Sequence, residues 1–126
     1  MLLTDFGTSY TKILDTRLGG PPRVISTREP APGFRADLGT GHNAGRRSRT
    51  SVNELTALAR GGEALIPEPD FVLLDCGSRD IKFVRYRKGR IADMGWNAEC
   101  GASMGFTIEL LATYYKLDYT RIPVPG

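Results

Sequence analysis

The sequence predicts an α/β fold with two small lobes, each built on a β-hairpin sheet and one helix. A short apolar run that ends on an aspartate and leads into a glycine turn occurs twice, at Asp5 and at Asp75. Each copy is followed further along the chain by a stretch in which apolar residues recur with helical spacing. The prolines within residues 67–69 mark a stiff connector between the two copies. We therefore expect a first lobe over residues 1–66 and the start of a second lobe over residues 70–126.

The first lobe begins with a predicted hairpin that is followed by a third strand. Met1–Asp5 and Thr11–Leu14 are the two strands of the hairpin, and Phe6–Ser9 is the turn between them. Arg23–Thr27 contains the β-branched residues that are typical of a strand. The segment Glu29–Asp37 is rich in proline and glycine, and we expect it to form a loop.

A helix is predicted to close the first lobe. Leu38–Gly45 is expected to be a turn because glycines recur in it, and Arg46–Thr50 is expected to lead into the helix. Ser51 and Glu54 have the spacing of a capping box at the helix N-terminus. Gly61-Gly62 is expected to end the helix. The predicted apolar face consists of Val52, Leu55, Thr56 and Ala59.

The second lobe begins with a second hairpin and ends with a helix. Phe71–Leu74 is expected to be a buried strand, Cys76–Ser78 a turn, and Ile81–Tyr86 and Ile91–Met94 two further strands. A helix is predicted from about Gly105 to Lys116. Apolar residues cover most of its circumference, which indicates burial on two sides, against a sheet and against another chain. The expected inward-facing residues are Ile108, Leu111, Ala112 and Tyr115, widened by Leu110, Tyr114 and Leu117.

A strand, a carboxylate, a glycine turn and a returning strand can together hold a phosphate. Backbone N–H groups at the turn face the anion, and the carboxylate faces its magnesium. One such hairpin is a weak signal because Asp-x-Gly turns are common in ordinary β-hairpins. Here the pattern occurs twice with a lysine just beyond each turn, as Asp5 with Lys12 and as Asp75 with Lys82. The doubled pattern predicts a pair of phosphate-binding hairpins.

Five short motifs, in a fixed order along the chain, carry a resemblance to a known family. Asp5–Lys12 matches D-x-G-S-T-x-x-K, and Asp75–Lys82 matches D-I-G-G-Q-D-x-K. Segments similar to T-G-Y-G-R, E-I-T-x-H-A-x-G and N-D-K-C-A-A-G-T-G occur at Thr40–Asn43, Glu54–Gly61 and Asn97–Gly105. With these motifs the chain resembles the ATPase activators of 2-hydroxyacyl-CoA dehydratases and the related ATPase subunits of benzoyl-CoA reductases.

The motifs depart from the family pattern at several positions. In the second phosphate motif, Arg79 replaces a glutamine and Ser78 replaces a glycine, and Leu58 replaces the histidine of the fourth motif. Members of the family are longer, and they continue into a second cluster cysteine and a glycine-rich adenosine-binding motif that this sequence lacks. A helix that the family places within residues 30–37 is missing as well. The resemblance therefore implies a shortened member of the family or a fragment of a longer chain.

The resemblance implies a reduced actin-like ATPase fold, also called ribonuclease H-like, in which two hairpins face each other around Mg-ATP. Asp5 and Asp75 would hold magnesium through water, and Lys12 would neutralise phosphate charge. The residues of the two turns would contact the phosphates. The implied cofactor-binding residues are Asp5, Gly7, Thr8, Ser9, Lys12, Asp75, Gly77, Ser78 and Lys82.

Cys100 lies just before the second predicted helix, where free N–H groups and the helix dipole stabilise a thiolate. In the family, the matching cysteine ligates a four-iron four-sulfur cluster that two subunits share, and such a cluster requires four thiolates. The resemblance therefore implies Cys100 as an iron–sulfur ligand, with an inert inherited cysteine as the alternative. Cys76 and Trp96 are expected in the core. The lone His42 is expected on the surface.

The composition is that of an ordinary globular protein, with 40% hydrophobic residues, 25% charged residues and a net charge of +3. Basic clusters at residues 46–49 and 85–90 are interpreted as a solvated loop and a hairpin tip. The other interpretation is a patch for an acidic partner or an anionic CoA substrate, and nucleic acid fits less well. The chain has neither a signal peptide nor a long apolar span, so we expect a cytoplasmic protein without membrane contact.

The leading hypothesis for function is a component of an ATP-driven, low-potential electron-transfer system that acts on an acyl-CoA or a similar substrate. The alternative is a non-catalytic, truncated ATPase-like subunit that serves as an assembly surface in a larger complex. A small relative of sugar or acetate kinases would explain the hairpins but not the segment Asn97–Gly105. The chain is not expected to be an independent ATPase. We expect a homodimer, or a heteromeric complex with an ATPase or reductase subunit.

Overall fold

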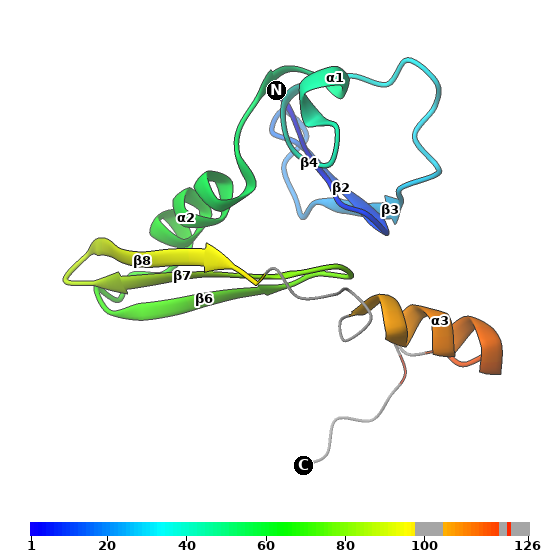
Figure 1. The fold of residues 1–126 in the computed structure, drawn as a ribbon. Coiled ribbons are helices and arrows are strands. Elements are labelled where there is room, and N and C mark those ends of the chain that lie inside the picture. Colours follow the sequence, from blue (N-terminus) through cyan, green and yellow to red (C-terminus); the bar gives the residue numbers. More distant parts are fainter. Residues whose placement is uncertain (98–104, 119–120, 122–126) are drawn as a thin grey trace. The chain divides into compact units, whose positions relative to one another are not determined.

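The computed structural model describes residues 1–97, 105–118 and 121. The chain divides into two compact units, Met1–Glu68 and Pro69–Gly126, and each unit is described by itself. Both units combine strands with helices, which confirms the predicted α/β class (Figure 1). Within the described residues, no helix is both long and apolar enough to cross a membrane.

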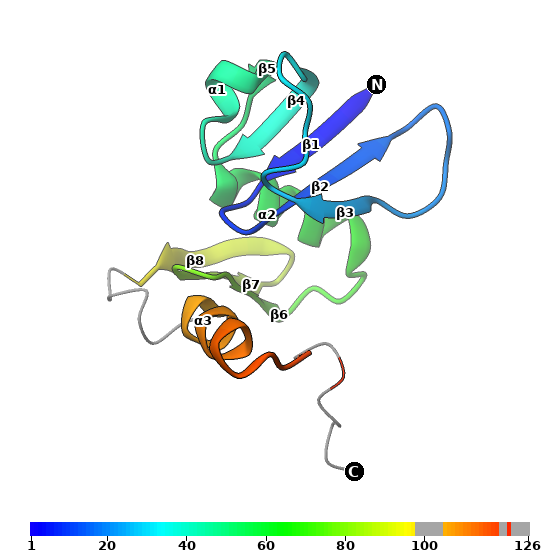
Figure 2. The same ribbon diagram turned by 90° about the vertical axis from the view of Figure 1, so that its right-hand side faces the viewer.

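A five-stranded sheet forms the centre of the first unit, in the order β3-β2-β1-β4-β5 (Figure 2). The antiparallel pairing of β1 with β2 agrees with the predicted hairpin, and the predicted third strand β3 pairs antiparallel with β2. The other two strands run parallel to β1, so that β1 has a partner on each side. The strands are β1 (Leu2–Phe6), β2 (Tyr10–Asp15), β3 (Arg23–Ser26), β4 (Ala36–Gly41) and β5 (Ser48–Ser51).

The prediction of a turn over Leu38–Gly45 and a lead-in segment over Arg46–Thr50 is wrong. These residues contribute to β4, to the short helix α1 (Ala44–Arg47) and to β5. The glycine at position 39 serves close packing instead of a turn. A Cβ atom there would lie 2.6 Å from the Ser48 hydroxyl oxygen and 3.0 Å from the Phe6 ring.

Helix α2 (Glu54–Leu65) closes the first unit, but both of its ends differ from the prediction. Its N-cap is Asn53 instead of Ser51, and the Asn53 Oδ1 atom accepts hydrogen bonds from two helix N–H groups. The helix also continues through Gly61 and Gly62 for about one more turn than predicted. Its buried residues are Leu55, Ala59 and Gly62, so the second glycine belongs to the packed face.

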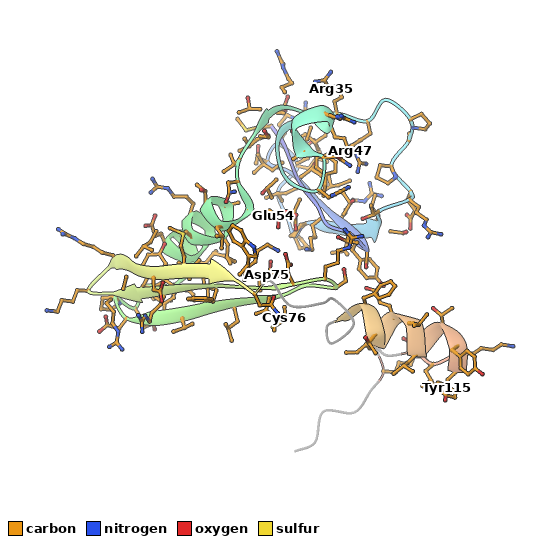
Figure 3. All side chains as sticks on the ribbon, viewed as in Figure 1. Arg35, Arg47, Glu54, Asp75, Cys76 and Tyr115 are labelled. Carbon is orange, nitrogen blue, oxygen red and sulfur yellow. The ribbon has the colours of Figure 1, made fainter. Side chains whose placement is uncertain are left out.

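The core of the first unit is centred on Phe6, which is fully buried together with Ala36 and Ala44. The ring of Phe34 meets the Phe6 ring edge-on, with 6.3 Å between the ring centroids. The Arg47 guanidinium of α1 lies 4.3 Å from the Phe6 ring centroid, which is a cation–π distance (Figure 3). Helix α1 and strand β4 therefore cover the end of β1.

The second unit contains a three-stranded antiparallel sheet in the order β6-β7-β8, drawn side by side in Figure 1. Residues Lys82, Val84 and Tyr86 alternate along the middle strand and are buried on one face. The ring of Phe71 stacks on that of Tyr86, with centroids 4.4 Å apart. The elements are β6 (Phe71–Cys76), β7 (Ile81–Arg87), β8 (Arg90–Trp96) and helix α3 (Gly105–Tyr115).

The strands of the second unit occur where the sequence predicts them, but several apolar residues expected in the core are exposed. The run Phe71–Leu74 is not buried throughout, because Val72 and Leu74 project from the exposed face of β6. Cys76 is an exposed free thiol, and Trp96 is exposed at the end of β8. The core positions predicted for Cys76 and Trp96 are therefore wrong.

The predicted burial of α3 against the sheet is wrong at most positions, and its burial against another chain stays a prediction. Of the described residues in this helix, Ala112 is the buried one, whereas Ile108, Leu111 and Tyr115 are exposed. Figure 3 shows Tyr115 near the C-terminal end of the helix. The apolar surface of α3 is thus largely open to solvent in the 126-residue chain.

Candidate functional site

The two hairpins that carry the predicted phosphate motifs have the same internal register. Asp5 lies directly across from Lys12 in the β1–β2 pair, and Asp75 lies directly across from Lys82 in the β6–β7 pair. In each hairpin, the glycine two residues after the aspartate lies in the connecting turn. The structure therefore brings together aspartate, glycine and lysine within each unit, as the sequence pattern predicts.

The turn of the first hairpin is closely packed around Gly7. A Cβ atom at this position would collide with the Tyr10 carbonyl group, so the glycine is required by the approach of the returning strand. The Gly7 carbonyl oxygen accepts a hydrogen bond from the Thr27 hydroxyl group at 2.8 Å. The Thr27 N–H donates to the Ser9 carbonyl oxygen at 3.0 Å. Thr27 thus holds both sides of the turn, and sequence reasoning did not assign it any site role.

The carboxylate of Asp5 is paired with the lysine opposite. The Lys12 Nζ atom lies 2.8 Å from Asp5 Oδ2, and both side chains remain partly exposed. An exposed pair of this kind contributes little to stability, so both groups stay accessible to an anion or a cation. Thr8 is exposed in the same turn.

A second contact that sequence reasoning missed is made by the end of β4. Thr40 is the parallel partner of Asp5, and Gly41 has a φ angle of 89°. A Cβ atom on Gly41 would lie 2.9 Å from Asp5 Oδ1 and 2.5 Å from the Phe6 carbonyl oxygen. The next N–H group, that of His42, donates to the Phe6 carbonyl oxygen at 2.7 Å, while the His42 side chain is exposed as predicted. The Thr40-Gly41 pair stands in one of the five resembling motifs, but its place beside Asp5 depends on long-range strand pairing.

The second turn arranges the same residue types differently. The Lys82 Nζ atom donates to Asp80 Oδ1 at 2.7 Å, and Lys82 is mostly buried. Asp75 is exposed at the end of β6, where Figure 3 labels it together with Cys76. The Gly77 N–H donates to the Asp80 carbonyl oxygen at 2.9 Å. The lysine of the second hairpin is therefore bound by an aspartate of its own turn.

Two elements hold the second turn in place. Asn97 follows β8 and exchanges two hydrogen bonds with Ile81, one through its side chain at 2.8 Å and one through its N–H at 3.0 Å. Helix α3 begins against the turn, with the Phe106 N–H donating to the Ser78 carbonyl oxygen at 2.9 Å. The Gly105 N–H makes a longer hydrogen bond of 3.4 Å to the Gly77 carbonyl oxygen. These contacts use helix N–H groups that have no partner within the helix.

Among the described residues, no group of three or more histidine, cysteine, aspartate or glutamate side chains is arranged to hold a metal ion. Cys100, the predicted iron–sulfur ligand, lies outside the described residues. The aspartates of the two turns remain candidates for magnesium bound through water. Oxygen ligands supplemented by water are what magnesium prefers.

At the other end of the β1–β2 hairpin, a clear pKa shift occurs. Arg17 donates hydrogen bonds from its guanidinium group and from its backbone N–H to the Asp15 carboxylate, at 2.7–3.0 Å. These hydrogen bonds and the charge of Arg17 hold the pKa of Asp15 below its ordinary range and raise the pKa of Arg17. Asp15 lies at the end of β2 that is away from the glycine turn, so the Asp15–Arg17 pair lies outside the candidate phosphate site.

No protein-family model and no curated protein sequence matches this chain. Among solved structures, component A of the (R)-2-hydroxyglutaryl-CoA dehydratase of Acidaminococcus fermentans is similar, with a TM-score of 0.68 and 17% sequence identity. The match covers 94% of this chain and 54% of component A, so the chain spans about half the length of that protein. Two further structures match with lower scores. They are the ethanolamine utilization protein EutJ of Carboxydothermus hydrogenoformans (TM-score 0.48, 18% identity, 94% of this chain and 57% of that one) and an exopolyphosphatase of Cytophaga hutchinsonii (TM-score 0.47, 14% identity, 90% and 58%).

The likeness to component A shows the fold, and the expected actin-like ATPase fold is thereby confirmed. At 17% identity the likeness shows the fold alone.

Proposed function

We propose that this chain is a phosphate-binding component of an ATP-driven, low-potential electron-transfer system related to the 2-hydroxyacyl-CoA dehydratase activators. The observation that supports this proposal most directly is the identical register of aspartate and lysine around a glycine turn in both units. The similarity of the fold to a dehydratase component A also supports this proposal.

The residues of the first turn fit a magnesium-bound phosphate chain. Asp5 offers carboxylate oxygens at the end of β1, and Lys12 offers a positive charge 2.8 Å from them. Thr8 and Ser9 lie in the turn, where backbone N–H groups and hydroxyl groups suit phosphate oxygens. A magnesium ion held through water by Asp5 would neutralise charge on the phosphates when nucleotide is bound. Lys12 would then exchange its contact with Asp5 for one with a phosphate oxygen.

The residues of the second turn fit the same group less well. Lys82 is held by Asp80 and is mostly buried, so moving it toward a phosphate requires breaking that ion pair. Asp75, Gly77 and Ser78 would contribute the carboxylate and the turn contacts on this side. We therefore expect the first hairpin to contribute more to phosphate binding than the second.

The electron-transfer part of the proposal rests on Cys100 and on the resemblance in sequence. The chain contains two cysteines, whereas a four-iron four-sulfur cluster needs four thiolates. The described residues offer one of these cysteines, Cys76, and they do not fit a complete cluster by themselves. Cys100 would therefore ligate a cluster together with cysteines of another subunit, which makes a homodimer or a heteromeric complex part of the proposal.

A second candidate function is that of a non-catalytic ATPase-like subunit that serves as an assembly surface. The observation that favours it is the apolar surface of α3 and β6, where Leu74, Ile108 and Tyr114 are exposed. Exposed apolar surface of this extent is typical of interaction sites.

Titration calorimetry with Mg-ATP and with magnesium tripolyphosphate tests the proposed function. We expect both ligands to bind with similar affinity, weaker than about 1 μM, because the candidate contacts of the two turns are with phosphates alone. Asp5→Asn should weaken both ligands, whereas the control Asp93→Asn, on β8 and paired with Arg85, should not.

Two results would contradict the proposal in different ways. Tight binding of Mg-ATP without binding of tripolyphosphate would show that adenosine recognition dominates. Failure of both ligands to bind at millimolar concentration would favour the assembly subunit. For the cluster, Cys100→Ser should abolish iron binding in the assembled complex, and unchanged iron content would remove the electron-transfer role.

A further inference from the structure

Four arginines lie around strand β5 of the first unit. Arg46 and Arg47 end helix α1 directly before β5, and Arg49 lies within the strand. Arg35, the residue before β4, also reaches this strand, because its guanidinium group donates to the Ser48 carbonyl oxygen at 3.2 Å. Figure 3 labels Arg35 and Arg47 in the first unit. The four residues together give this end of the sheet a positive charge.

The charge around β5 is not neutralised by the described residues, among which these four arginines have no ion pair. Other carboxylates of the first unit are engaged elsewhere, in the ion pairs Asp5–Lys12, Asp15–Arg17 and Glu63–Arg60. Asp37 is the one acidic residue within residues 34–50, and its carboxylate accepts a hydrogen bond from the Leu2 N–H at 2.8 Å. The arginines around β5 therefore remain available to an anionic partner.

Strand β5 is also the edge of the five-stranded sheet in the described part of the chain (Figure 2). It pairs parallel with β4, and directly after it the Val52 N–H donates to the Gly39 carbonyl oxygen at 2.9 Å. Successive residues of a strand direct their backbone groups to opposite sides, so the groups of Thr50 face β4 as well. Those of Arg49 and Ser51 point away from the sheet and can pair with a further strand.

The charge of this edge restricts which strand can pair with it. Charged side chains on an edge strand commonly protect it from unwanted pairing. Here the charge has one sign, so it repels a basic strand and attracts an acidic one. The exposed side chains of β5 are polar, so an apolar strand gains little by covering them. A second copy of this chain is a poor occupant, because each described strand carries at most one aspartate or glutamate.

We propose that the β5 edge binds an extended, acidic segment of a partner protein by strand addition. The backbone of the segment pairs with the outward groups of Arg49 and Ser51, and its carboxylates bind the arginines around β5. Arginine suits this role because its planar guanidinium group can hold a carboxylate through two parallel hydrogen bonds. The Arg47 guanidinium already lies 4.3 Å from the Phe6 ring centroid, so this side chain loses little freedom on binding.

A labelled peptide in which glutamate and threonine alternate tests this proposal by fluorescence anisotropy with the full chain. We expect saturable binding that weakens as salt is added, and Arg49→Glu should weaken it by about tenfold or more because it replaces attraction with repulsion. The matched control is Arg23→Glu, an equal change of net charge on β3, the opposite edge strand of the same sheet. Both arginines are exposed, so both variants should stay folded, which thermal melting checks, and the control should leave the affinity unchanged.

The same peptide with N-methyl groups along its backbone separates strand addition from attraction between charges. It keeps every carboxylate but has no backbone N–H group to donate, so it should bind more weakly by about tenfold or more. The unmodified peptide should also slow amide exchange at Arg49 and Ser51. Absence of binding, equal binding of the two peptides, or equal effects of Arg49→Glu and Arg23→Glu would overturn the proposal.

Two competing ligands distinguish this surface from other anion sites. Single-stranded DNA that binds more tightly than the peptide at the same salt concentration, and loses affinity in Arg49→Glu, would overturn the proposal in favour of nucleic acid. Asp5→Asn should weaken tripolyphosphate and leave peptide binding unchanged, whereas Arg49→Glu should do the reverse. Loss of both ligands in Arg49→Glu would overturn the proposal, because the arginines would then bind phosphate. The acidic-segment proposal does not depend on the proposed function, and each can fail alone.

Discussion

The hairpins β1–β2 and β6–β7 share a motif and a register but differ in what surrounds them. Around the first turn, Thr27 approaches from just after β3 and Gly41 from the end of β4, and Asp5 stays paired with Lys12. Around the second turn, Asn97 and the start of α3 provide the support, and the lysine pairs with an aspartate of its own turn. The short motif thus specifies the hairpin, whereas the neighbouring elements decide which of its charged groups stay accessible.

The largest expected difference between the two hairpins concerns the residue after the aspartate. Phe6→Ala should destabilise the first unit by about 3–5 kcal/mol, because Phe6 is fully buried against Ala36, Ala44 and Phe34. Cys76→Ala at the equivalent position should change stability by less than about 0.5 kcal/mol, because Cys76 is exposed. Urea denaturation of the two variants measures both effects. Similar losses for the two substitutions would show that Cys76 is covered in solution.

The next largest effect is expected at Gly41, which has no equivalent beside β6 in the described residues. Gly41→Ala should cost about 1–3 kcal/mol, because the added Cβ meets the Phe6 carbonyl group and the backbone has a positive φ. Gly89→Ala serves as the control, because Gly89 also has a positive φ but has open space around it, so its cost should be about 1 kcal/mol. Thermal melting compares the two. Gly41→Ala should additionally weaken tripolyphosphate binding through the displaced Asp5 carboxylate, and equal affinity would argue against a role of Asp5.

A smaller effect is expected from the residues that hold the two turns. Asn97→Ala removes the acceptor of the Ile81 N–H, and Thr27→Val removes the donor to the Gly7 carbonyl oxygen. Each substitution should cost about 1 kcal/mol. Amide exchange should become faster in the second turn for Asn97→Ala and in the first turn for Thr27→Val. Faster exchange in the other unit's turn would contradict the separate support of the two hairpins.

The smallest effect is a pH dependence confined to the first hairpin. The pKa of Asp15 is lowered by Arg17, so this carboxylate contributes stability that is present above the ordinary aspartate pKa and is lost as the pH falls below it. In the second hairpin the equivalent position is Arg85. An NMR titration should show the low pKa of Asp15 returning toward its ordinary value in Arg17→Ala. An unchanged pKa in that variant would rule out Arg17 as the cause.

Local patterns were sufficient to predict both hairpins, because alternation and Asp-x-Gly turns act within a few residues. Strand β4 was missed because its pairing with β1 joins distant segments and because Gly39 is there for close packing. Asn53 and Ser51 are both able to cap α2, and the choice follows from Ser51 being used in β5. The end of α2 was misplaced because Gly62 belongs to its buried face.

Burial in the second unit could not be predicted from the sequence. Val72 and Trp96 are of residue types that are common in cores, but whether they are buried depends on the presence of another layer over the sheet. The roles of Thr27 and Gly41 beside the first turn were missed for a related reason. Both residues reach the turn from other strands, and no spacing along the chain encodes that contact.

Helix α3 starts in direct contact with the glycine turn of the second hairpin, through hydrogen bonds from the Gly105 and Phe106 N–H groups. This contact is close, because a Cβ atom on Gly105 would lie 3.2 Å from the Gly77 carbonyl oxygen and 3.3 Å from the Ser78 Cα atom. A shift of the start of the helix toward the turn would therefore require Gly77 and Ser78 to move as well. The hydrogen-exchange rates of the Gly105 and Phe106 amides report how often the hydrogen bonds between the helix and the turn open. The turn proposed to contact phosphate therefore directly adjoins a helix whose apolar residues are largely exposed.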